Sequence, residues 1–322
     1  MKNRDYLFAV SAIRANELTL LKDSDLEQLI NAPDYKKAVS MLAEKGFEMP
    51  EGNNYSKMLD EEIEKTWKLI NESAPEANAL KTFIVKNDFQ NLKAILKAEM
   101  TGNDAEKYFV APCVFDSAKM YKIISERKFD ELPDFISDTA KRAYDAIVKT
   151  GSGQLCDILV DTAAVEAIVS FAKQSNDELL IKYANQFCLL TNIKTALRSI
   201  RTNKNRAFLE NAIAETDFID KKQFIDEALK GKDELLELLK QKGFSGPVQA
   251  LENGTSAFEK YCDDELMGIM KKAKMTVFGI SPLAGYFVAR ETEIKCLRII
   301  LSAKLSGVSN DIVRERMREL YV

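Results

Sequence analysis

Apolar residues recur at helical spacing along most of the chain. Intervals of three and four residues bring apolar side chains to one side of a helix, whereas strands alternate with a period of two. Clear examples of the helical pattern lie at 26–30, 35–42 and 235–239. Two of these stretches run into Lys-Gly-Phe, at 45–47 and 242–244. Glycine there can adopt the left-handed conformation that ends a helix, and the phenylalanine can pack back on the last turn. The pattern predicts an all-helical chain.

One short segment is the best candidate for a strand, and several serines are candidates for helix starts. The segment Tyr108–Phe115 is interrupted by Pro112, which cannot donate a hydrogen bond to a sheet. Serine side chains can accept hydrogen bonds from the first free N–H groups of a helix. Four serines are predicted to cap helices: Ser24, Ser256, Ser281 (with Pro282 in the first turn) and Ser309.

A weak internal repeat divides the chain into thirds. The segments 91–97, 192–198 and 293–299 share the order polar, branched aliphatic, Lys, small, apolar, and 101 residues separate each from the next. This period exceeds the roughly 20–50 residues of solenoid repeats. We therefore expect three similar helical domains around a shared axis, at residues 1–105, 106–206 and 207–322. The alternative is a coincidental match between short helical segments.

The composition of the chain indicates which classes of partner it can bind and in which compartment it is found. The chain has 46 basic and 50 acidic residues, whereas nucleic-acid binders normally carry a basic excess, so we expect no nucleic-acid partner. The longest uncharged stretch, 275–289, falls short of the roughly 20 residues that span a bilayer, and no secretory leader is evident. Five scattered cysteines indicate reduced thiols and a cytoplasmic protein.

Catalytic chemistry finds little support in the sequence. The chain contains no histidine, which removes the commonest general base and the commonest metal ligand. It also lacks the Gly-rich phosphate loop of nucleotide-binding enzymes. We expect no catalytic residue, no cofactor and no metal. An enzyme that uses carboxylates or lysine stays as an alternative.

Four cations cluster near the end of the second repeat segment. Arg198, Arg201, Lys204 and Arg206 lie within nine residues. Such a cluster can bind an acidic protein surface or a lipid headgroup. It can equally be a solvated helix end, where cations favour the negative end of the helix dipole.

The C-terminal third carries a family resemblance. It contains Pro282-Leu283, Tyr286, Arg290–Ile294, Leu297-Arg298, and then Lys304 and Gly307. This order resembles the C subunit of the prokaryotic V/A-type ATP synthase/ATPase, whose eukaryotic counterpart is the d subunit of the V-ATPase. The opening segment Tyr6–Arg14, with an aromatic residue, alanines and an arginine, is similar to the start of that family. One departure is Cys296, where relatives often carry asparagine.

The resemblance implies three helical domains in a funnel with pseudo-threefold symmetry. It also implies a non-catalytic central-stalk subunit, peripheral to the cell membrane, that couples the central shaft to the membrane rotor ring for proton or sodium transport. Shaft subunits and the ring would be its partners. The motif positions expected to serve structure or interfaces are Pro282, Tyr286, Glu291, Glu293 and Arg298.

Two alternatives stay open at this point. Glu291, Glu293 and Arg298 either face a partner or form caps and ion pairs inside the protein, and we favour the internal role. The chain as a whole could also be an all-helical adaptor or scaffold that binds a soluble partner.

Overall fold

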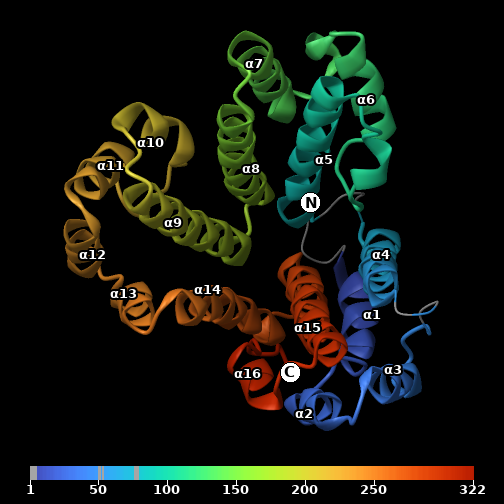
Figure 1. Cartoon of the computed structure of the whole chain (residues 1–322). Helices are drawn as coiled ribbons and strands as arrows, with labels where there is room; N and C mark the ends of the chain where they lie inside the picture. Colours follow the sequence, from blue (N-terminus) through green and yellow to red (C-terminus); the bar gives the residue numbers. More distant parts are fainter. Residues whose placement is uncertain (1–5, 50–51, 53, 76–79) are drawn as a thin grey trace. The chain divides into compact units, whose positions relative to one another are not determined.

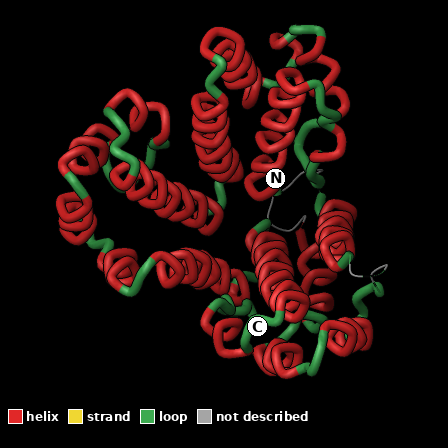
Figure 2. The backbone as a smooth tube through the Cα atoms, viewed as in Figure 1, coloured by secondary structure: helices red, strands yellow, loops and turns green. Residues whose placement is uncertain are grey.

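A computed structural model of the chain describes residues 6–49, 52, 54–75 and 80–322. Helices account for 77% of the structure, and no strand occurs in the described ranges (Figure 2). The all-helical prediction is therefore confirmed.

The chain divides into two compact units. The first combines both ends of the chain, residues 1–79 and 250–322, and the second comprises residues 80–249. Helix α13 (Ser245–Glu252) contains the point of division. The three sequential domains and their pseudo-threefold arrangement stay a prediction.

Helix α15 (Ser281–Ser306) is the central element of the first unit (Figure 1). Leucines of α2, α3, α4 and α15 are fully buried around it, and burial of each stabilises the fold by roughly 1.5–3 kcal/mol. The other elements, all of which pack against α15, are α1 (Leu7–Glu17), α2 (Asp23–Asn31), α3 (Tyr35–Glu44), α4 (Tyr55–Ser73), α14 (Thr255–Met270), η4 (Lys271–Met275) and α16 (Asn310–Glu315).

Helix α8 (Gly153–Ser175) has the corresponding place in the second unit. It packs against α5, α7, α9 and α10, and a helix covered on several sides needs apolar residues around most of its circumference. The remaining elements are α5 (Lys81–Thr101), η2 (Glu106–Tyr108), α6 (Ser117–Ser125), η3 (Phe129–Glu131), α7 (Asp134–Thr150), α9 (Glu178–Arg201), α10 (Arg206–Ala212), α11 (Lys221–Lys230) and α12 (Lys232–Gln241).

The two Lys-Gly-Phe helix ends form as predicted. Gly46 and Gly243 have φ values of 95° and 88°, in the left-handed region. The N–H of Phe47 donates to Leu42 O at 3.1 Å, and that of Phe244 to Leu239 O at 2.8 Å. These bonds satisfy carbonyls that a helix end otherwise leaves free.

The predicted serine caps are mostly displaced by one or two residues. Helix α2 begins at Asp23, because Asp25 accepts the N–H of Lys22 and makes that residue the cap. Ser256 and Ser281 lie inside helices whose caps are Gly254 and Ile280. Pro282 lies in the first turn of α15, as expected, and Ser309 occupies the cap position of α16, although its side chain makes no capping hydrogen bond there.

The best strand candidate, Tyr108–Phe115, forms no strand, as its interruption by Pro112 indicated: Tyr108 ends η2, and residues 109–115 are a loop. Side chains of α5 take the backbone groups that a neighbouring strand would need. Asn91 accepts the N–H of Val110 at 2.7 Å and donates to its carbonyl at 3.0 Å. Asp88 accepts the N–H groups of Val114 and Phe115.

Candidate functional site

The start of α15 is enclosed by protein on all sides. Every residue from Ser281 to Arg290 is buried. Gly285 is required by close packing, because a Cβ there would lie 2.7 Å from the Tyr321 hydroxyl and 2.8 Å from the Cβ of Ala273. Pro282 and Tyr286, two of the predicted site residues, therefore have no exposed surface with which to meet a partner.

Arg290 and Glu293 form a buried ion pair at the centre of the first unit. Arg290 Nη1 donates to Glu293 Oε2 at 2.7 Å, and the two residues are only 6% and 2% exposed. Arg290 Nη2 also reaches the hydroxyls of Thr19 and Tyr286. Glu293 Oε1 accepts the N–H of Leu21. One pair of side chains thus fastens the segment after α1 to α15, far away in the sequence.

Burial also sets the electrostatics of this pair. It raises the pKa of Glu293 from 4.5 to about 7, although the charge of Arg290 and the Leu21 N–H act in the opposite direction. Burial lowers the pKa of Arg290, but Glu293, Tyr286 and Glu62 together outweigh that effect, and the net pKa is raised.

The other two predicted motif residues lie nearer the surface. Glu291 and Arg298 are half-buried. Arg298 donates to Ser56 Oγ at 2.8 Å and to Asp60 Oδ1 at 2.5 Å, both on α4. The motif therefore comprises a buried network, made by Tyr286 and Glu293 with Arg290, and an outer contact at Arg298.

The first positions of the three repeat segments have the same local role. Asn91, Asn192 and Glu293 lie on α5, α9 and α15, and all three are at most 2% exposed. Each side chain accepts a backbone N–H from a loop packed against its helix: Val110, Ala214 and Leu21, respectively. A buried backbone group needs such a partner, since leaving it unsatisfied costs about 1–3 kcal/mol.

The four cations of the predicted basic cluster differ in their partners. Arg206 pairs with Asp226 of α11 at 2.6 Å. Lys204 donates to Gln154 of α8 at 3.1 Å and lies over the ring of Phe208. Arg198 and Arg201 are exposed, and neither has an ion pair within the part of the chain that the structure describes.

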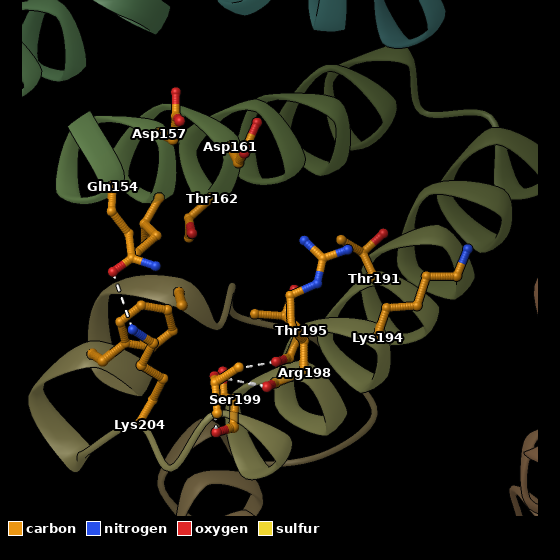
Figure 3. Close-up of a pocket in the computed structure, with 14 residues that line it drawn as sticks. Gln154, Asp157, Asp161, Thr162, Thr191, Lys194, Thr195, Arg198, Ser199 and Lys204 are labelled. Carbon is orange, nitrogen blue, oxygen red and sulfur yellow. Dashed lines mark hydrogen bonds between the residues drawn. The ribbon is translucent and has the colours of Figure 1, made fainter. Parts of the chain in front are cut away.

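A cavity of about 670 Å³ lies between α8, α9 and α10 of the second unit (Figure 3). Arg198 and Lys204 contribute to its wall, and so does Lys194, which the sequence cluster did not include. Lys194 and Arg198 are four residues apart, and this spacing places both on one face of a helix. Helical spacing is the signal that would have found Lys194.

The described residues offer no catalytic or metal-binding arrangement. No group of three or more potential metal ligands occurs among them. Burial raises the pKa of the thiols of Cys156 and Cys296 to about 11 and that of Cys188 to about 12. These thiols stay protonated at neutral pH, and the thiolate is the reactive form. Nor does any described helix combine the length and apolar character needed to cross a bilayer.

Several related proteins align with nearly the whole length of the chain. The C subunit of the V-type sodium ATPase of Enterococcus hirae is 24% identical, in an alignment that covers 96% of this chain and 97% of that protein. The C subunit of the A-type ATP synthase of Methanocaldococcus jannaschii is 20% identical, with 98% and 86% covered. The C subunit of the A-type ATP synthase of Methanobrevibacter smithii is 22% identical, in an alignment that covers 97% of this chain and 88% of that protein.

The family comparison agrees with these relatives. The ATP synthase (C/AC39) subunit family matches residues 9–316. The match includes the α15 network, the three repeat segments and the cavity of the second unit. The chain therefore belongs to the ATP synthase (C/AC39) subunit family, whose members are non-catalytic subunits of the ATPase complex, so it is not itself an enzyme.

Proposed function

We propose that the chain is the central-stalk subunit of a V/A-type ATP synthase/ATPase, and that it couples the central shaft to the membrane rotor ring. The observation that carries this proposal is the family match over residues 9–316, together with relatives aligned over almost their entire lengths. Proton and sodium transport are both compatible with it. The proposed partners are the shaft subunits and the ring, and the proposed location is the cytoplasmic face of the membrane.

The proposed architecture is a funnel of three similar domains, 1–105, 106–206 and 207–322, related by pseudo-threefold symmetry. It is supported by the shared local role of Asn91, Asn192 and Glu293 on α5, α9 and α15. A common ancestor of the three segments accounts for the equal spacing of 101 residues and for this shared role.

A protein that couples two rotating parts makes and breaks no covalent bonds, so its task is mechanical. Torque is transmitted without loss only through a stiff body, and close-packed protein interiors have low compressibility. The burial of α15 and the Arg290–Glu293 pair would supply such stiffness in the first unit, where both ends of the chain meet. We assign Pro282, Tyr286 and Glu293 to this internal role, and Arg298 to bracing α4 through Asp60.

Purification of the intact complex tests the proposal. The full chain, tagged and expressed in its native cell, is captured from detergent-solubilised membranes, and its companions are identified by mass spectrometry. We expect shaft and ring subunits in constant proportion. Recovery of soluble proteins alone would favour the adaptor alternative and exclude the coupling role.

A functional measurement separates coupling from mere attachment. Membranes from cells that lack the chain should hydrolyse ATP without building an ion gradient, and adding the purified chain back should restore the gradient. Gradient formation that does not depend on the chain would contradict the proposed role, even if the chain is captured with the complex.

A further inference from the structure

Two pairs of cations occupy aligned positions on α5 and α9, both in the second unit. Lys93 and Lys97 lie 101 residues before Lys194 and Arg198. On α5 both cations are neutralised by α8: Lys93 pairs with Asp161 at 2.5 Å, and Lys97 with Asp157 at 2.8 Å. An acidic helix, with two carboxylates four residues apart, therefore covers this face of α5.

On the aligned face of α9, no carboxylate of the described residues pairs with the two cations. Lys194 and Arg198 are exposed, line the cavity, and form no ion pair with any described residue. The carboxylates of Asp157 and Asp161 point away from Arg198 (Figure 3), toward the lysines that they neutralise.

The charge left in the cavity is positive. Its titratable lining consists of Asp157, Asp161, Lys194, Arg198 and Lys204. The two carboxylates are neutralised from α5, and Lys204 is held by Gln154 and the Phe208 ring. The charges of Lys194 and Arg198 are not balanced within the cavity.

The direction of these cations favours an extended acidic surface over a single small anion. Figure 3 shows the side chains of Lys194 and Arg198 diverging from α9 rather than converging on one point. Residues four apart on a helix have Cβ atoms about 5–6 Å apart. Two carboxylates at the same interval on a partner helix match this spacing, as Asp157 and Asp161 match Lys93 and Lys97.

We propose that the cavity face of α9 binds an acidic helix of a partner protein, with two carboxylates one turn apart that pair with Lys194 and Arg198. This contact would repeat, between two chains, the contact that α8 makes with α5 inside this one. The contact itself is argued from the cavity. That the partner is a subunit of the ATPase rests on the proposed function.

A peptide-binding measurement with the full chain tests the contact directly. The probe is a labelled peptide with the sequence of residues 153–175, the helix that covers α5, and the matched probe carries Asp157→Asn and Asp161→Asn. Fluorescence anisotropy at low ionic strength should show binding of the acidic probe about tenfold tighter than binding of the matched probe. Added salt should reduce the difference, since the charges are solvent-accessible.

Variants of the chain locate the binding. Lys194→Gln with Arg198→Gln should weaken binding of the acidic probe about tenfold. The control is Lys182→Gln with Lys222→Gln, which removes the same charge from exposed positions outside the cavity and should leave binding unchanged. In a charge-swap arm, Lys194→Glu with Arg198→Glu should instead prefer a probe with Asp157→Lys and Asp161→Lys.

Three outcomes would overturn the proposal. The first is equal binding of the acidic and matched probes. The second is acidic-probe binding that survives the loss of both Lys194 and Arg198. The third is saturable binding of tripolyphosphate without binding of the acidic probe, which would indicate a small-anion site. If any of these occurs while membranes still yield shaft and ring subunits with the chain, the proposed function stands and only the helix contact is refuted.

Discussion

Helices α15 and α9 carry aligned residues but differ in what surrounds them. On α15, Glu293 is buried with Arg290, and the aligned cation Lys295 pairs with Asp263 of α14 at 2.5 Å. On α9, Asn192 is buried in the same way, yet the aligned Lys194 faces a cavity without a partner in the described part of the chain.

The difference separates two uses of one sequence pattern. The first position of each repeat segment points inward, where any unsatisfied polar group is expensive, so its effect should appear in folding stability. The third position points outward, where water or another molecule can satisfy it. Substitutions at the third position should therefore change binding more than stability. Measurements of folding stability for variants at both positions test this difference.

The largest expected effect is at Arg290. The change Arg290→Ala leaves Glu293 buried without its counterion, and breaking a buried ion pair from one side costs about 4 kcal/mol. Urea unfolding followed by circular dichroism measures the loss. The matched control Arg298→Ala breaks an exposed pair with Asp60 and should cost less than about 1 kcal/mol. Equal losses would mean that burial does not distinguish the two arginines.

The pH dependence of Glu293 gives the next largest effect. Its pKa in the folded protein, about 7, lies above the ordinary 4.5, so between these values the folded chain binds more protons than the unfolded chain. The stability contributed by this group is therefore full below about pH 4.5 and is lost as pH rises through 7.

The variant Glu293→Gln isolates that contribution. Gln cannot ionise, so the stability of the wild type relative to the variant should fall by roughly 2.5 kcal/mol between about pH 5 and pH 8. Unfolding of both proteins across this range measures the difference. A relative stability that rises with pH would show that attraction to Arg290 outweighs burial.

Asn192 tests the inward position on α9 itself. Its side chain satisfies both the N–H and the carbonyl of Ala214, at 3.0 and 2.8 Å. The change Asn192→Ala leaves these backbone groups unpaired and should destabilise the protein by about 2 kcal/mol. In contrast, Asn211→Ala removes only a bond to the preceding turn and should change stability by less than about 0.5 kcal/mol. A loss at Asn192 no greater than at Asn211 would contradict a common inward role.

The sequence predicted those features that depend on neighbouring residues. The Lys-Gly-Phe helix ends formed as expected because glycine conformation and the bond to the preceding turn are both local. The sequence showed the spacing of 101 residues, but the burial of the first position of each segment emerged only from the structure.

Features that depend on distant contacts were not predictable from the pattern. Glu293 meets Leu21 across 272 residues, and nothing in the motif indicates this contact. Within the cluster Arg198–Arg206, the end of α9 at Arg201 places Arg206 on α10, where it pairs with Asp226. Lys194 was missed because the cluster was defined by nearness in sequence, whereas the cavity selects residues one turn apart.

The smallest expected effect concerns the third position of the repeat segments. Removing its cation should raise the folding stability on α9 and lower it on α5. Lys194 and Arg198 are like charges one turn apart, which destabilise a helix by a few tenths of a kcal/mol. The change Lys194→Gln should therefore raise stability by about 0.3 kcal/mol. The aligned change Lys93→Gln removes a pair with Asp161 and should lower stability by up to about 1 kcal/mol. Replicate urea unfolding resolves the sign of the difference between the two variants. A loss at Lys194 as large as at Lys93 would show that α9 already has a counterion within the chain, and a face that is already neutralised has no charge left for a partner helix.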